Sequence, residues 1–205
     1  MELVPTNEEV IAMLRETGAL RDGHFEYPNG AHANEYLQVA LAFRYYQQAK
    51  LLSVGLSRRL RADPEIRAMI KQLSIVCPNN TAGLPIAYGV CEALRAHQVY
   101  WAEKDDDNAP LRFRQFVAPV AGEKVLLVDD VLRSGQRFSE LRHLLESNGA
   151  QVVGLAVAVY QPNPNVASFG NLPIFYLAEM DAVYYNDSKS CELCRKGVPV
   201  EKVWT

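Results

Sequence analysis

Residues 125–137 read VLLVDDVLRSGQR, a run of apolar residues that ends in two aspartates and continues through a short polar loop into a helix. The unbroken apolar run predicts a strand that is buried on both faces of a sheet. Ligands of an open parallel sheet bind beyond the carboxyl ends of its strands, where helix N-termini present unpaired amides to anions. This stretch therefore predicts a phosphate site at residues 134–137, beside a pair of carboxylates.

Each residue type in this loop suits such a site. Gly135 lets a phosphate approach the backbone closely, and Ser134 offers a hydroxyl group. Arg133 and Arg137 add positive charge if their side chains point inward. The Asp129-Asp130 pair would repel a phosphate, so we expect it to meet a ribose diol or a metal-bound group.

The pattern on either side of this stretch is typical of parallel βαβ construction. Apolar runs predict strands at 73–77, 99–102, 125–128 and 152–159, separated by helices at 84–97 and 138–145. Nearer the N-terminus, we expect a helix that begins with a capping box at Thr6 and Glu9, a hairpin at 23–38 and a helix with one buried stripe at 45–60. Residues 111–117 are expected to form a hairpin arm over the site. The sequence thus predicts an α/β protein.

The composition limits the classes of function. A net charge of −3 on 205 residues gives no general attraction to phosphate backbones, so we expect no nucleic-acid partner. No apolar run approaches the roughly 20 residues that cross a bilayer, and polar and acidic residues stand where a signal peptide would be apolar. We therefore expect a cytoplasmic protein with no membrane partner.

The Cys191-x-x-Cys194 pair leaves three alternatives open. Four cysteines are too few for a disulfide scaffold of this size, and a reducing compartment would keep most of them as thiols. The pair fits half of a zinc site, a local disulfide, or two free thiols. No second cysteine pair lies nearby, and the histidines are scattered along the chain: His24, His32, His97 and His143.

Residues 125–137 resemble the segment with which type I phosphoribosyltransferases bind phosphoribosyl pyrophosphate (PRPP): an apolar strand, two acids and a small-residue loop. The resemblance covers nearly the whole chain and is strongest to one branch of orotate phosphoribosyltransferases, of which this chain looks like a divergent member. The N-terminal hood of that branch resembles GAL at 18–20, GHF at 23–25, GAH at 30–32 and YLQ at 36–38. Its central segment and tail resemble residues 102–124 and 191–199.

The resemblance implies the type I phosphoribosyltransferase fold, a central, mostly parallel sheet flanked by helices with a small N-terminal hood. It implies three parts: an N-terminal helix and hood at 1–40, a phosphoribosyltransferase core at 41–180, and a tail with the Cys-x-x-Cys pair at 181–205. We expect Tyr184, Tyr185 and Trp204 to pack this tail against the body or a partner subunit.

The chemistry implied by the resemblance is Mg²⁺-dependent transfer of a phosphoribosyl group from PRPP to a nitrogen base, in a homodimer. Catalysis would fall to Lys104, Arg112, Arg114, Asp129 and Asp130. PRPP would be bound by Asp129, Asp130, Arg133, Ser134, Gly135, Gln136 and Arg137, together with Asn80, Thr81, Ala82 and Gly83 of a second loop that cradles pyrophosphate. Mg²⁺ would be held through PRPP, with Asp129 or Asp130 as a candidate ligand.

Three positions leave the choice of base and the retention of turnover open. The resemblance implies orotate as the base and Phe25, Tyr27 and Gln161 as its contacts. Orotate enzymes of this branch place an arginine at position 161 to meet the orotate carboxylate, and glutamine cannot form a charged fork with it. Arg133 and Gln136 also replace small residues of the phosphate loop. A different base, or a noncatalytic PRPP- or nucleotide-binding protein of the same fold, are the alternatives.

Overall fold

The computed structural model describes residues 4–106, 109–163 and 165–203. The N-terminal part contains α1 (Asn7–Glu16), β1 (Leu20–Glu26), β2 (His32–Leu37) and α2 (Ala40–Phe43). It is followed by α3 (Tyr46–Ala62), α4 (Pro64–Met69), the 3-10 turn η1 (Ile70–Gln72), β3 (Leu73–Pro78), α5 (Gly83–Leu94) and β4 (Gln98–Ala102). The remaining elements are β5 (Lys124–Leu132), α6 (Gln136–Ser147), β6 (Gln151–Tyr160), β7 (Ile174–Glu179), β8 (Tyr184–Tyr185), α7 (Glu192–Arg195) and β9 (Glu201–Lys202).

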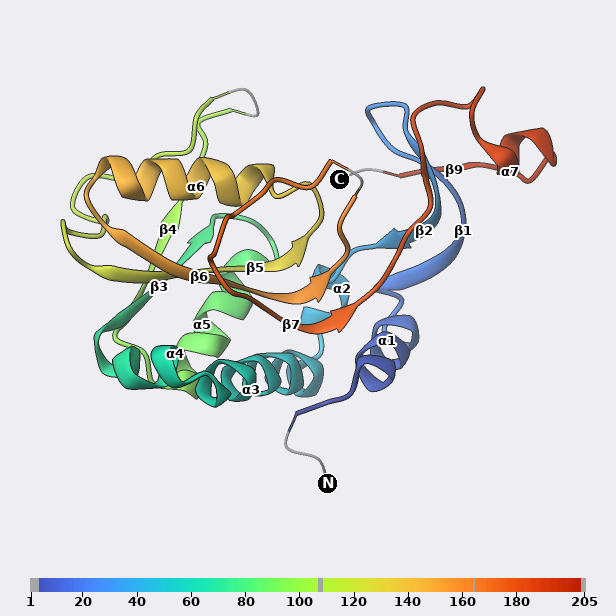
Figure 1. The fold of residues 1–205 in the computed structure, drawn as a ribbon. Coiled ribbons are helices and arrows are strands. Elements are labelled where there is room, and N and C mark those ends of the chain that lie inside the picture. Colours follow the sequence, from blue (N-terminus) through green and yellow to red (C-terminus); the bar gives the residue numbers. More distant parts are fainter. Residues whose placement is uncertain (1–3, 107–108, 164, 204–205) are drawn as a thin grey trace.

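Five parallel strands form the central sheet, in the order β4-β3-β5-β6-β7. Helix α6 covers one face, and α3, α4 and α5 cover the other (Figure 1). The chain moves outward from β3 to β4 and then returns to the opposite side of β3 to form β5. The connections that leave β3 and β5 therefore run to opposite sides, and ligands of such sheets bind in the crevice between them.

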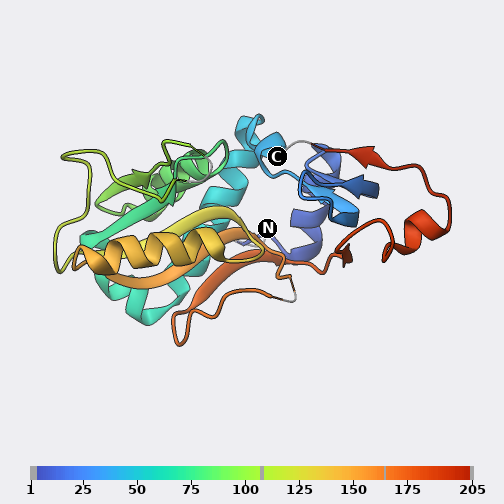
Figure 2. The ribbon, with the colours of Figure 1, turned by 90° about the horizontal axis from the view of Figure 1, so that it is seen from above.

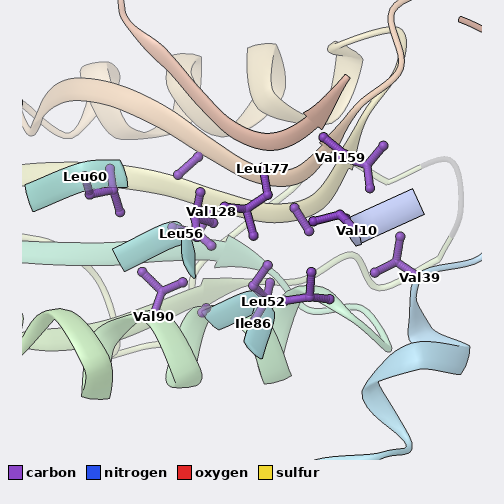
Figure 3. Packing of buried hydrophobic residues seen from close by; sticks show 14 of the residues in the cluster. Val10, Val39, Leu52, Leu56, Leu60, Ile86, Val90, Val128, Val159 and Leu177 are labelled. Carbon is purple, nitrogen blue, oxygen red and sulfur yellow. The ribbon is translucent and has the colours of Figure 1, made fainter. Parts of the chain in front are cut away.

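A stripe of leucines attaches α3 to the sheet. Leu52, Leu56 and Leu60 recur every four residues and are fully buried, as the pattern at 45–60 predicts. They pack with Ile86 and Val90 of α5 beneath the sheet (Figure 3). This packing fixes the face of the sheet opposite α6, and it also holds the strand ends from which the site is built.

Two expected elements differ in the structure. Strand β5 continues to Leu132 instead of ending near 128, so both aspartates lie within its last residues. The expectation of a hairpin arm at 111–117 is wrong: in the described part of this segment, pairing is limited to one antiparallel bridge between Glu103 and Arg112. Beyond the bridge Phe113 packs against the core, but residues 114–116 are exposed, so no continuous apolar face holds a second strand in place.

The hood is a second, four-stranded sheet with the order β8-β2-β1-β9. The hairpin β1–β2 forms its centre, and the two short strands of the tail pair with its two edges. Phe25, Tyr36 and Val203 form its small apolar cluster. The hood and the tail lie together at one end of the molecule (Figure 2), whereas Trp204 is outside the described residues. In the described ranges no helix is long and apolar enough to cross a membrane.

Candidate active site

A cleft of about 470 Å³ opens at the carboxyl ends of β3 and β5, where the strand order places a ligand site. Four segments line it: the loop after β3, the residues after β4, the end of β5 with the start of α6, and the link between β2 and α2. Of the expected residues, the lining includes Asn80, Thr81, Ala82, Lys104, Asp129, Asp130, Arg133, Ser134, Gly135, Gln136 and Arg137. Residues 36–38, Ala40 and Glu140 are further lining residues.

The Asp129-Asp130 pair lies at the floor of this cleft. Asp129 is buried and Asp130 partly exposed. Asn80 Nδ2 donates a hydrogen bond to Asp129 Oδ1 over 3.1 Å, and Arg137 Nη1 lies 3.8 Å from Oδ2. Burial and the neighbouring Asp130 carboxylate nevertheless raise the pKa of Asp129 well above its usual range. The pair therefore favours an incoming cation or hydroxyl donors, which would stabilise the ionised carboxylate.

The loop after β3 forms a small cradle of backbone amides. The amides of Ala82 and Gly83 both donate to Asn80 Oδ1, at the start of α5. A β-carbon at Gly83 would lie 2.9 Å from the Pro78 carbonyl oxygen and 3.0 Å from Asp129 Oδ1, so only glycine fits. An oxyanion that approached this cradle would compete with the amide oxygen of Asn80 for the same two donors.

The loop after β5 turns sharply into α6. Gly135 adopts φ +73° at the N-terminus of the helix, and Ser134 Oγ accepts a hydrogen bond from the Gln136 amide over 3.3 Å. Gln136 Nε2 donates to Glu140 Oε1 one turn later, so the Gln136 side chain lies along α6. This bulky residue consequently does not fill the loop.

We expect Gly135→Ala to lower the free energy of unfolding by about 2–4 kcal/mol. Alanine is strained in the left-handed backbone conformation, and its β-carbon overpacks the site. A β-carbon there would lie 2.9 Å from the Phe169 ring. Gly122→Ala is the matched control, because its φ is +80° with no atom within 4 Å of the added carbon. Urea unfolding of both variants measures the difference, and equal losses would show that the Phe169 contact is unimportant.

Arg133 extends from the loop after β5 toward the hood. Its Nη2 donates to the Leu37 carbonyl oxygen over 2.6 Å, and its Nε donates to Gln161 Oε1 over 2.9 Å. The Tyr184 hydroxyl donates to the same Gln161 oxygen over 3.2 Å. Both of these acceptors are neutral, so they do not neutralise the Arg133 guanidinium. Arg133 thus places a positive charge next to the glutamine at position 161.

Neither of the two aromatic residues expected to contact the base is part of the cleft lining. Phe25 is buried in the hood cluster, and Tyr27 packs against that cluster. The Tyr27 hydroxyl is buried without a hydrogen-bond partner among the described residues, and burial raises the pKa of Tyr27 to about 12, opposed by the nearby Arg133. Tyr27 is thus a neutral donor beside Arg133 and Tyr184.

Only one of the three cations expected to act in catalysis from the central loop lines the cleft. Lys104 lines the cleft, with its Nζ 2.9 Å from Glu140 Oε2. Arg112 forms an ion pair with Asp105, and Arg114 forms one with Glu103, at exposed positions outside the cleft. In this arrangement Lys104 alone of the three can reach a ligand in the cleft.

The profile of the phosphoribosyl transferase domain matches residues 55–168, which is more than half of the chain. The chain belongs to the phosphoribosyltransferase family. Two curated relatives, both named orotate phosphoribosyltransferase, come from Carboxydothermus hydrogenoformans (32% identical, 95% of each chain) and Thermotoga maritima (32% identical, 93% of this chain and 94% of the relative). The resemblance stated from the sequence is therefore confirmed.

Solved structures of other phosphoribosyltransferases share the fold of this one. The orotate phosphoribosyltransferase of Aeropyrum pernix superposes with a TM-score of 0.66 at 18% identity, over 83% of this chain and 93% of that one. The Mycobacterium tuberculosis orotate phosphoribosyltransferase gives 0.62 at 18% identity, over 84% and 95%. The predicted type I phosphoribosyltransferase fold is thus confirmed.

Some cleft residues of this phosphoribosyltransferase were not predicted from the sequence. Glu140 lies one helical turn after Gln136, and this i, i+4 spacing is a signal that could have placed it on the same face of α6. The sequence pattern at 36–38 indicates only a part of the hood. Their place in the cleft depends on how the hood packs on the core, which local sequence patterns do not encode.

Proposed function

We propose that this protein is an orotate phosphoribosyltransferase, which transfers the 5-phosphoribosyl group of PRPP to orotate and releases pyrophosphate. In this reaction the C1–N bond to orotate forms, the bond between C1 and the pyrophosphate oxygen breaks, and the proton of the attacking ring nitrogen is lost. The observation that carries the proposal is the cleft itself, because it brings the acidic pair, two anion-binding loops and Arg133 together. The relatives' names support orotate as the base.

Each part of PRPP has a suitable partner in the cleft. The 5-phosphate fits the N-terminus of α6, where amides, the Ser134 hydroxyl and the Arg137 charge can meet it. The ribose diol fits the Asp129-Asp130 pair, because hydroxyl donors would stabilise the buried Asp129 carboxylate, whose pKa is raised by burial. Pyrophosphate fits the cradle of Ala82 and Gly83, near Lys104, so the two anionic ends of PRPP lie on opposite sides of the acidic pair.

Mg²⁺ suits the same place. Carboxylates are the hard oxygen ligands that it prefers, and Asp129 and Asp130 lie within the lining of the cleft. When bound, the ion neutralises charge that develops on the leaving pyrophosphate. Asn80 keeps the Asp129 carboxylate oriented through the hydrogen bond to Oδ1, and Lys104 supplies further positive charge to the departing group.

The base is proposed to lie between Arg133, Leu37 and Tyr27. Arg133 can pair with the orotate carboxylate, because its guanidinium lies against Gln161 in the place where the orotate branch has an arginine. Gln161 is buried and would position Arg133 without touching the base. The unpaired Tyr27 hydroxyl is a donor for a carbonyl oxygen of the ring.

The direct test mixes the purified protein with PRPP, Mg²⁺ and orotate, and follows the loss of orotate absorbance. Loss of orotate with release of one pyrophosphate supports the proposal. PRPP-dependent thermal protection without orotate turnover, but with pyrophosphate release in a screen of other bases, would assign a different base. Protection by PRPP with no turnover of any base would assign a noncatalytic PRPP-binding protein.

Asp129→Asn should stabilise the ligand-free protein by more than about 1 kcal/mol at pH 7.5 while weakening PRPP binding by about 10- to 150-fold. The raised pKa means that the folded protein retains a proton which the unfolded chain has lost, so wild-type stability falls as pH rises above the ordinary aspartate range. Asparagine does not ionise, so the variant does not lose stability in this way as the pH rises. The gain should therefore vanish near pH 4, as urea unfolding across pH would show.

Asp130→Asn is the matched control, because this side chain is only partly buried. It should weaken PRPP binding by about 1–3 kcal/mol. It should stabilise the ligand-free protein less than Asp129→Asn, because it removes the repulsion by Asp130 and leaves the Asp129 carboxyl buried. Equal stabilisation by the two variants would show that the loss of stability does not come from the burial of the Asp129 carboxylate.

We further propose that the enzyme is a cytoplasmic homodimer. Large exposed aromatic side chains on neighbouring helices support a second copy as the partner: Tyr45, Tyr46 and Tyr88 are at least half exposed. Light scattering of the purified protein measures the oligomeric state, and a monomeric mass at micromolar concentration would contradict this part of the proposal.

A further inference from the structure

Four potential metal ligands meet where the tail contacts the hood. They are His24 of β1, His32 of β2, and Cys191 and Cys194 at the start and within α7, and their ligand atoms all lie within 4.8 Å of one another. His24, His32 and Cys191 are buried. We propose that these four side chains bind one structural zinc ion, which attaches the tail to the hood.

The distances in the cluster are close to those of a tetrahedral Cys2His2 site. Zinc bonds of about 2.0–2.1 Å to nitrogen and about 2.3 Å to sulfur place tetrahedral N and S ligands about 3.5 Å apart. Here Cys191 Sγ lies 3.4 Å from His24 Nε2, and Cys194 Sγ lies 3.6 Å from both His24 Nε2 and His32 Nδ1. The two imidazole nitrogens are 2.8 Å apart, so zinc would part them by about 0.5 Å.

The second nitrogen of His24 is held as it is in zinc sites. His24 Nδ1 lies 2.8 Å from the Val198 carbonyl oxygen, and a carbonyl can only accept, so Nδ1 carries the hydrogen. In the neutral ring, Nε2 then keeps its lone pair and faces the cluster. Hydrogen bonds of this kind fix the tautomer and orientation of zinc-binding histidines.

The turn after the cysteines brings Val198 to this position. Gly197 adopts φ +68°, its amide donates to the Cys194 carbonyl oxygen, and the Val198 amide donates to the Leu193 carbonyl oxygen. The chain thus reverses directly after the Cys-x-x-Cys pair and returns to His24. One short segment supplies two ligands and the carbonyl that orients a third.

The segment of the tail between β8 and β9 has little else to hold it in place. Between residues 186 and 200 Cys191 is the only buried residue, and β9 pairs with β1 through two residues (Figure 1). Segments with so little apolar core commonly depend on a metal or a disulfide. A Cys191–Cys194 disulfide would join two residues of the same turn and leave the two histidines without a role, whereas zinc joins the tail to both hood strands.

The first measurement is the metal content of the full-length wild-type protein, purified without chelators, by plasma mass spectrometry. We expect about one zinc per chain. After removal of the metal, titration with Co²⁺ should give the visible bands of four-coordinate cobalt and a thiolate-to-cobalt band at one equivalent. Absence of zinc together with no cobalt spectrum would overturn the proposal, as would an intact mass 2 Da low from a disulfide.

Variants assign the site. Cys191→Ser/Cys194→Ser and His24→Asn should lose the bound zinc, whereas Cys91→Ser and His143→Asn, which change the same residue types outside the cluster, should keep it. Zinc that persists in the first two variants would place it elsewhere, for example at the acidic pair. If those variants fold poorly, the cobalt spectrum of the wild type and of Cys91→Ser still decides.

Discussion

Replacing Lys104 with alanine should lower kcat by about 10²- to 10³-fold and leave the affinity for PRPP within about tenfold. Lys104 is the cation of the central loop that lines the cleft, next to the acidic pair. Its charge would be used mainly when pyrophosphate departs, because negative charge on the leaving oxygen is greatest at that point. Removing an interaction made mostly in the transition state lowers kcat more than ground-state binding.

Steady-state kinetics and PRPP-induced thermal shifts check this prediction. Lys71→Ala removes an equally charged side chain from an exposed position and controls for the change of net charge. Glu140→Gln, which keeps the lysine and removes its 2.9 Å ion pair, should cost less than about tenfold because the cation remains. A Lys104→Ala enzyme with wild-type kcat would show that another residue, such as Arg112 or Arg114 of a partner subunit, neutralises pyrophosphate.

Replacing Arg133 with methionine should reduce kcat/KM for orotate by about 30-fold to several thousand-fold, since truncating one member of a desolvated charge pair costs about 2–5 kcal/mol. Methionine keeps much of the length and removes the charge. PRPP-induced thermal protection should persist, because the guanidinium lies against Leu37 and Gln161 at the hood side of the cleft. Equal losses of orotate turnover and PRPP binding would place Arg133 at the phosphate instead.

A double variant that moves the positive charge from position 133 to position 161 gives a stricter test of this role of Arg133. Arg133→Thr/Gln161→Arg gives the loop the small residue, and position 161 the arginine, that the orotate branch is expected to carry. If the structure places the two side chains correctly, the double variant should recover much of the activity lost by Arg133→Thr alone. No recovery would show that the guanidinium must come from the loop, or that the base is not orotate.

Much of the core was predictable because its patterns are local. The apolar run at 125–128 followed by the two aspartates predicts a buried strand that ends at a ligand site, and the four-residue spacing of Leu52, Leu56 and Leu60 predicts a helix with one buried face. In both cases the period of the apolar residues within one segment shows which side chains are buried, whatever segment covers them. The predicted arm at 111–117 is reduced to one bridge, because Leu111 and Phe113 pack against the core whereas residues 114–116 are exposed.

The sequence by itself determined the α/β class, the order of the first four core strands and the helices between them, and the positions of the loops after β3 and β5, since helix and strand periods and turn residues record these directly. The tertiary structure alone decided which distant side chains meet. Arg133 lies against Gln161 because the adjacent strands β5 and β6 end side by side. His24 and His32 lie against Cys191 and Cys194 because the hood and tail fold into one sheet. The contacts between hood and tail join residues more than 150 positions apart in the sequence, and no local period records them.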